Sequence, residues 1–128
     1  MPRVVSVATG SAVDFPNQDP IYHNVFSVST TRRFDLGKYP KGQSRSVTFP
    51  KAGVVNVYCD IHSDMAAFIL VLPNRAFARP RADGSWQLPD VPPGRYTLCW
   101  WHPDFPAGRR ELEVGSSGDA VVDVSFAP

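Results

Sequence analysis

Short runs of alternating apolar and polar residues, separated by turn-forming residues, make up most of this 128-residue chain. Alternation with a period of two is typical of strands that bury one face. Two further runs, 66–72 and 95–102, have apolar residues on both faces, as in strands buried on both sides. The pattern predicts an all-β protein with strands at 3–8, 11–15, 22–29, 44–49, 53–59, 66–72, 95–102, 109–114 and 120–126.

Composition agrees with short strands joined by tight turns. The chain has thirteen prolines and nine glycines, which favour turns over long helices. Residues 30–44 combine three of these turn formers with four of the thirteen basic residues, and we expect a solvated connection there. A docking surface for an acidic redox partner is the alternative for this stretch. Its basic residues are Arg32, Arg33, Lys38 and Lys41.

Length and charge exclude several classes of function. A chain of 128 residues fits one compact domain, or two very small ones that share a core. No apolar run is long enough to span a membrane. The formal net charge of +1 gives no electrostatic reason to expect nucleic acid or an anionic membrane as a partner. The N-terminus lacks the regions of a secretion signal, so we expect either a cytoplasmic protein or a secreted one whose signal is absent from this chain.

A possible metal site follows the strand predicted at 53–59. Cys59, His62 and Met65 are each three residues apart, so one tight loop can turn all three side chains toward a single point. Thiolate, imidazole and a weak thioether suit copper that cycles between Cu(I) and Cu(II). The set needs a second histidine from elsewhere in the chain, and His23 is the best donor.

Simpler interpretations exist for each of these residues. A cysteine at the end of an apolar strand is usually a small core residue, and a methionine usually fills a gap in the core. Zinc is the competing metal, with Asp60 or Asp64 as its fourth ligand. The thioether of Met65 favours copper over zinc.

Two motifs together resemble the cupredoxins, the blue-copper proteins of the plastocyanin, pseudoazurin and amicyanin type. The first is His23-Asn24-Val25, and the second is the Gly-x-x-x-x-Tyr-Cys strand from Gly53 to Cys59. The resemblance covers about the first 72 residues and implies a Greek-key β-sandwich outside the cytoplasm. It also implies one type 1 copper, with His23, Cys59 and His62 as equatorial ligands and Met65 as the axial ligand.

The same resemblance suggests roles for two neighbouring residues. Asn24 would act as a second-shell residue whose amide ties the His23 strand to the ligand loop, although an asparagine that caps a turn is an equally good interpretation. Tyr58 points away from the face that holds Cys59. It is a candidate for a partner-docking or electron-entry surface, and packing under a loop is the alternative.

A second resemblance covers the C-terminal part of the chain. Residues 82–98 resemble the carboxypeptidase-regulatory, or transthyretin-like, β module, with turns at Asp83-Gly84 and Pro92-Pro93-Gly94. We therefore expect a cupredoxin-like copper-binding region at 1–72, continued by a transthyretin-like β-sandwich extension at 73–128. The Pro73-Asn74 junction is too short for a flexible linker, so we expect the two parts to pack continuously.

Two residues of this second region carry reactive groups. Cys99 is expected to be a buried core thiol, and a Cys59–Cys99 disulfide would exclude the copper site. His102 is expected to be an exposed histidine without a role, and an approach to the metal is the alternative.

These observations favour a protein that transfers single electrons between protein redox partners through one copper ion. With one histidine left over, the chain cannot build the further copper centres needed for oxygen or nitrite reduction, so we expect no enzyme. Storage or delivery of copper is the second hypothesis. A structural β module without a redox role is the third.

Overall fold

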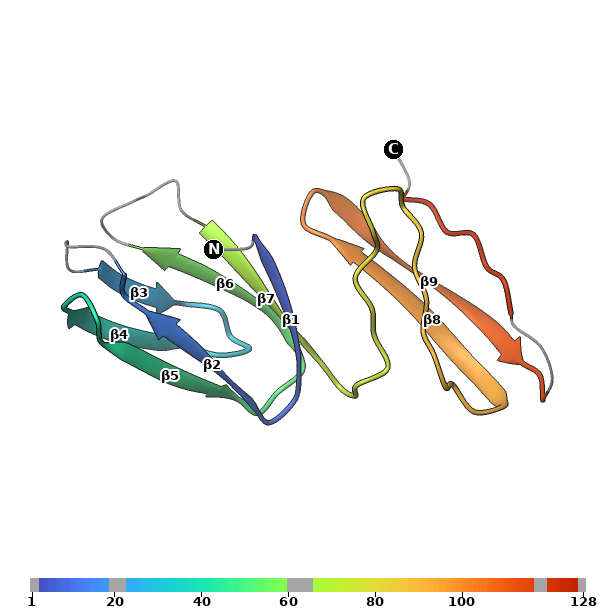
Figure 1. Cartoon of the computed structure of the whole chain (residues 1–128), viewed down its shortest axis with the longest axis horizontal. Helices are drawn as coiled ribbons and strands as arrows, with labels where there is room; N and C mark the ends of the chain where they lie inside the picture. The colour runs from blue at the N-terminus through green and yellow to red at the C-terminus, as the bar shows by residue number, and fades with distance from the viewer. Residues whose placement is uncertain (1–2, 19–22, 60–65, 117–119, 127–128) are drawn as a thin grey trace. The chain divides into compact units, whose positions relative to one another are not determined.

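The structure, a computed structural model of the whole chain, describes residues 3–18, 23–59, 66–116 and 120–126, and only the backbone of His23 and Ala66. This described part of the chain contains strands and no helix (Figure 1), which confirms the prediction of an all-β protein. No helix in these ranges is long and apolar enough to cross a lipid bilayer. In chain order the strands are β1 (Val4–Ala8), β2 (Ser11–Pro16), β3 (His23–Ser27), β4 (Phe34–Tyr39), β5 (Ser44–Phe49), β6 (Gly53–Cys59), β7 (Ala66–Leu72), β8 (Gly94–His102) and β9 (Phe105–Val114).

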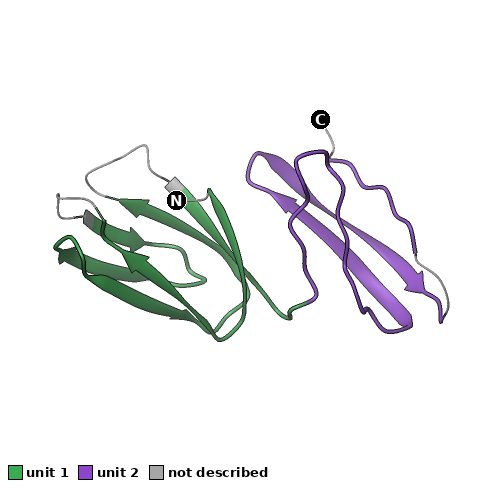
Figure 2. Cartoon of the chain, viewed as in Figure 1, with its two compact units in different colours: residues 1–75 green, residues 76–128 purple. Residues whose placement is uncertain are grey.

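The chain divides into two compact units, Met1–Arg75 and Ala76–Pro128, which Figure 2 colours green and purple. The first unit contains β1 to β7, and the second contains β8 and β9. The boundary expected from the sequence, after residue 72, lies three residues before the boundary in the structure, which follows Arg75. Continuous packing of the two parts stays a prediction.

The first unit is built from two sheets. The larger has the strand order β1-β7-β6-β3-β4, in which β1 runs parallel to β7 and the other neighbours are antiparallel. The smaller is the antiparallel pair β2-β5. The strands predicted at 44–49, 53–59 and 66–72 are found with those bounds.

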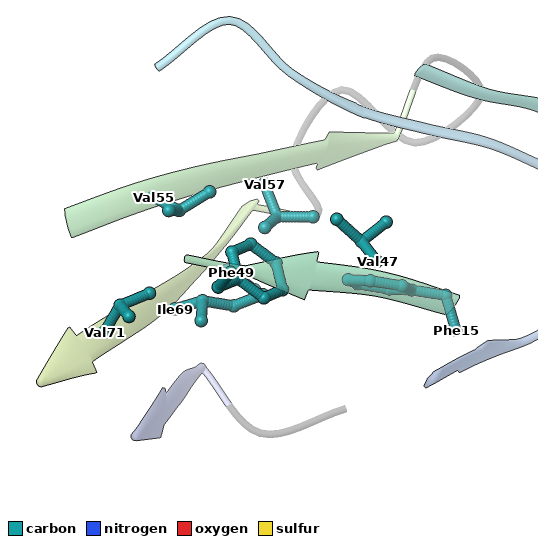
Figure 3. Close-up of a cluster of buried hydrophobic side chains, with 8 residues drawn as sticks. Phe15, Val47, Phe49, Val55, Val57, Ile69 and Val71 are labelled. Atoms are coloured by element: carbon teal, nitrogen blue, oxygen red, sulfur yellow. The ribbon is translucent and has the colours of Figure 1, made fainter. Parts of the chain in front are cut away.

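The apolar core of the first unit draws on strands from both sheets. Figure 3 shows side chains of β2 and β5 meeting those of β6 and β7. Phe49 and Val55 have no exposed surface. Burying a side chain of this size stabilises the fold by about 1.5–3 kcal/mol. The core residues are Phe15, Val47, Phe49, Val55, Val57, Ala67, Ile69 and Val71.

Strand β4 was not predicted from the sequence. The expectation of a solvated connection over residues 30–44 is wrong for this part, because Phe34 and Leu36 pack against the core and Tyr39 is buried. The register between β3 and β4 shifts between Asn24 and Phe26, so β4 has one residue more than β3 at that point. This irregularity puts Tyr39 out of step with Phe34 and Leu36, which hides the period of two.

The second unit is centred on a β8-β9 hairpin, which pairs from Gly94 opposite Val114 to His102 opposite Phe105. Trp100 lies opposite Gly108, and a Cβ at Gly108 would clash with the indole ring. The predicted turn at Asp83-Gly84 is confirmed: Gly84 has a φ of +88° and the Ser85 amide donates to the Asp83 carboxylate.

Several expectations for this unit are wrong. Cys99 is exposed instead of buried, and Tyr96, with 38% of its surface exposed, is also not a core residue. Residues 120–126 lie in none of the described strands. An apolar run is buried on both faces only where other layers of the protein pack on both sides of its sheet.

His102 has packing partners inside the second unit. Its ring lies 5.0 Å from that of Phe105 and 5.8 Å from that of Phe126. The Asp104 amide donates to Nδ1 of His102 at 3.0 Å. These contacts give the histidine a structural role, and an approach to a metal stays a prediction.

Candidate metal centre

Cys59 ends β6 on the face that points into the core. Alternation along this strand buries Val55, Val57 and Cys59, whereas Tyr58 on the opposite face is 37% exposed. Cys59 itself is 8% exposed, and neither Cys59 nor Cys99 forms a disulfide. The Cys59 side chain therefore lies in largely dry surroundings.

The neighbouring strand carries the first predicted histidine. Strand β3 pairs antiparallel with β6, with Val25 opposite Cys59 and Phe26 opposite Tyr58. The backbone of His23 lies two positions before Val25, in register with Tyr39 on β4. Two segments far apart in sequence, one with Cys59 and one with His23, are therefore adjacent in the sheet.

His62 and Met65 lie outside the described residues, and of His23 only the backbone is described. Within the described ranges, no three side chains of Cys, His, Asp or Glu come together. The ligand set His23, Cys59, His62 and Met65 therefore stays a prediction. The donor set itself, one thiolate, two imidazoles and a thioether, fits copper better than zinc.

Asn24 connects β3 to β4 through a side-chain hydrogen bond. Its amide donates to Oδ1 of Asp35 at 2.5 Å, and the Gly37 amide donates to the same oxygen at 2.9 Å. The two bonds span the register irregularity next to His23. The predicted bond from Asn24 to the ligand loop falls on residues 60–65, outside the described part of the chain, and stays a prediction.

This arrangement predicts an unusually acidic Asp35. The hydrogen bonds from Gly37 and then Asn24 favour the charged carboxylate and hold the pKa of Asp35 below its ordinary value of 3.8. Because the folded pKa is lowered, the stabilising effect is present above pH 3.8 and is lost as the pH falls through the folded pKa. We expect carboxyl NMR titration to give a midpoint below 3.8 for Asp35.

An Asn24→Ala variant supplies the test of the cause. Its Asp35 midpoint should move up toward 3.8 without reaching it, because the larger contribution from the Gly37 amide remains. Asp83, whose pKa is also lowered by hydrogen bonds to Ser85, serves as the internal control and should not move. An unchanged Asp35 midpoint in Asn24→Ala would contradict the assigned bond.

Tyr58 lies on the outer face of β6 beside Cys59. Its ring packs against Phe26 of β3, with centroids 5.8 Å apart. Part of the ring is covered by this contact and part is exposed. Both interpretations from the sequence, partner surface and packed tyrosine, therefore have a physical basis, and its role in electron entry stays a prediction.

Tyr39, whose role the sequence pattern does not indicate, anchors the strand paired with His23. Its hydroxyl donates to the Phe15 carbonyl at 2.7 Å, and its own carbonyl accepts a bond from the Asn17 amide at 2.8 Å. These bonds tie β4 to β2, across the two sheets. An aromatic residue directly before the Pro40-Lys41-Gly42 turn is the signal that could have revealed it.

The surroundings of Tyr39 also affect its ionisation. Burial raises the pKa of the Tyr39 phenol above 10.0, while the Arg45 guanidinium, 5.2 Å from the ring centroid, opposes the rise. The Cys59 thiol adds to the rise, since negative charge on its sulfur would disfavour a second negative charge at the phenol. Tyr39 is thus neutral at physiological pH.

Comparison with known proteins gives structural likeness only. Neither a protein-family model nor a curated protein matches the sequence. Among solved structures, a purple cupredoxin from Nitrosopumilus maritimus is 23% identical with a TM-score of 0.50, over 55% of this chain and 78% of that protein. An oxidised mutant of amicyanin is 25% identical with a TM-score of 0.50, over 54% of this chain and 69% of that protein.

A third match is to part of a larger protein. The Cu-containing nitrite reductase from Thermus scotoductus SA-01 is 25% identical with a TM-score of 0.52, over 57% of this chain. The match spans only 20% of the reductase. The resemblance of residues 73–128 to a transthyretin-like module stays a prediction. The sheets of the first unit, together with these likenesses, identify its architecture as the cupredoxin β-sandwich fold.

Proposed function

We propose that the first unit binds one type 1 copper ion through His23, Cys59, His62 and Met65, and that the protein passes single electrons between protein redox partners. The observation that carries the proposal is the buried Cys59 side chain, which forms no disulfide, at the end of β6 in a cupredoxin fold. Copper bound by such a ligand set supplies a one-electron couple between Cu(I) and Cu(II).

Strand register supports His23 as a ligand on the same side as Cys59. Val25 lies opposite Cys59 in the β3-β6 ladder, and His23 is two positions from Val25. Positions two apart on a strand belong to the same face, and directly paired residues share that face. Asn24 and Asp35 then brace β3 next to the ligand position.

The core around Cys59 supports a redox role over simple storage of the ion. Val57, 3% exposed, precedes Cys59 on the same face and limits access of water to the thiolate. A dry shell around a metal ligand influences the redox potential. Tyr39 stabilises the strands around the site because its two hydrogen bonds hold β4 against the second sheet.

Partners and location follow from the same proposal. The partners would be redox proteins that approach the end of the first unit with Cys59, where Tyr58 is the exposed candidate contact. We place the protein outside the cytoplasm, as the resemblance implies. No catalytic residue is assigned, since the proposed site is a carrier and not an enzyme.

The test is a visible absorption spectrum recorded while the metal-free, reduced protein is titrated with Cu(II). We expect an intense thiolate-to-copper band that saturates at one equivalent, and its complete loss in Cys59→Ser. Reversible voltammetry of the loaded protein would then support electron transfer. Ready release of Cu(I) to an acceptor, without fast electron exchange, would instead favour copper delivery.

Cys99 gives a matched control. It is the second free thiol and is exposed, so it can react with Cu(II) nonspecifically. The Cys99→Ser variant should keep the full band. A band that disappears in Cys99→Ser and persists in Cys59→Ser, or no band in the wild type, would refute the proposed site.

A further inference from the structure

A basic groove lies where the β3–β4 connection meets the β5–β6 turn. Figure 1 shows these two connections at the same end of the first unit. The groove has a volume of about 490 Å³, and its lining contains three cationic side chains, three threonines and no acidic residue. The lining residues are Thr30, Thr31, Arg32, Arg33, Thr48, Pro50 and Lys51.

The fold separates basic residues that lie close together in the sequence. Arg32 and Arg33 line this groove, whereas Lys38 lies next to the far end of β4, opposite Asn24 in the ladder. Lys51 joins the two arginines from the β5–β6 turn. Three positive charges from two connections are therefore gathered in one place, which the pattern of residues 30–44 does not indicate.

Arg32 is held in a fixed orientation by backbone acceptors. Its Nε donates to the Thr48 carbonyl at 2.9 Å, and Nη1 donates to the Arg33 carbonyl at 2.8 Å. A guanidinium has five N–H donors, so these two bonds leave three for a ligand. A side chain already fixed in place loses less conformational entropy when it binds.

The loop that presents these groups is also tied to the sheet. The Thr31 side chain packs so closely on Gly53 that a Cβ there would lie 2.7 Å from Oγ1. Further along β6, the backbone amide of Asn56 donates to the Ser29 hydroxyl at 2.9 Å. The β3–β4 connection is therefore fixed to the start of β6, and the groove is preformed.

We propose that this groove binds a free oxyanion of the phosphate class. A phosphate carries close to two negative charges and several acceptor oxygens, which match a cluster of cations with neighbouring hydroxyl donors. A single carboxylate would use fewer of these donors. The fixed fork of Arg32 contacts the anion, and the exposed Arg33 and Lys51 complete its neutralisation.

The groove is remote from the proposed copper site. Strand β6 runs from Gly53 beside the groove to Cys59, seven residues that span about 20 Å. Anion binding is therefore independent of the proposed function, and either proposal can fail without the other.

The experiment titrates the full-length protein with inorganic phosphate, and separately with pyrophosphate, at constant ionic strength with chloride as the balancing anion. Amide NMR shifts provide the readout. We expect saturable shifts that are confined to residues 30–33 and 48–53. The Arg33→Gln/Lys51→Gln variant should bind about tenfold more weakly, because two charge-assisted contacts are lost.

The matched control is Lys38→Gln/Lys41→Gln, which removes the same amount of charge from two lysines outside the groove lining. It should bind like the wild type. An equal loss of affinity in both variants, or the lack of saturation, would overturn the proposal. Binding to phosphatidylglycerol vesicles without a response to free phosphate would also overturn it and assign the groove to a lipid headgroup.

Discussion

Replacing Phe49 with alanine is expected to lower the free energy of unfolding of the first unit by about 3–5 kcal/mol. Phe49 has no exposed surface, and its ring meets that of Phe34 edge-on at 6.1 Å. It lies at the end of β5 among core side chains of the larger sheet (Figure 3). The cost combines lost apolar burial with a cavity between the sheets.

Urea denaturation, monitored through the amide NMR signals of β6 and β7, measures this effect in the first unit. Tryptophan fluorescence would not, because Trp86, Trp100 and Trp101 all belong to the second unit. Val28→Ala is the control: Val28 is 66% exposed and should cost less than about 0.5 kcal/mol. A loss below about 1 kcal/mol in Phe49→Ala would show that the two sheets do not pack around this ring.

The strands of the first unit were predictable where one face is buried without interruption. Val55, Val57 and Cys59 keep the period of two along the whole of β6, so both bounds and the buried face were read correctly. Strand β4 was missed because its extra residue near Gly37 breaks that period. Local patterns cannot reveal a bulge that is defined only against the neighbouring strand.

Burial in the second unit was less predictable, for a different reason. The run that includes Cys99 has the pattern of a strand buried on both faces, but such burial needs other layers of the protein on both sides of the sheet. Here β8 forms a ribbon with β9, and Cys99 stays exposed. Hydrophobicity predicts that a residue can be buried. It does not predict whether other elements of the fold pack on it.

The candidate site shows the same division between local and long-range information. The spacing of Cys59, His62 and Met65 is readable from sequence, and the adjacency of the His23 and Cys59 strands follows the resemblance. The hydrogen bonds that hold the strands around the site became visible only in the structure. The Asn24–Asp35 and Tyr39–Phe15 hydrogen bonds join residues eleven and twenty-four positions apart, and no local motif encodes these pairings.

Gly53→Ala is expected to destabilise the first unit by about 2–4 kcal/mol, through backbone strain and a steric clash. Gly53 has a φ of +144°, which side-chain-bearing residues rarely adopt. Its missing Cβ also makes room for Thr31, whose Oγ1 and Cγ2 would lie 2.7 and 3.0 Å from the new atom. Urea denaturation of unit-1 amide signals measures the loss.

Two further variants separate the strain from the clash. Gly10 has a φ of +84° and nothing within 4 Å of its Cβ position, so Gly10→Ala carries strain alone and should cost about 1–2 kcal/mol. Truncating the neighbour in Gly53→Ala/Thr31→Ala should restore about 1 kcal/mol relative to Gly53→Ala, a coupling that a double-mutant cycle isolates. Equal losses in Gly53→Ala and Gly10→Ala, with no recovery in the double variant, would mean that Thr31 does not hold the β3–β4 connection against β6. The groove would then lose the contact that makes it preformed, so this cycle also tests the rigidity on which oxyanion binding depends.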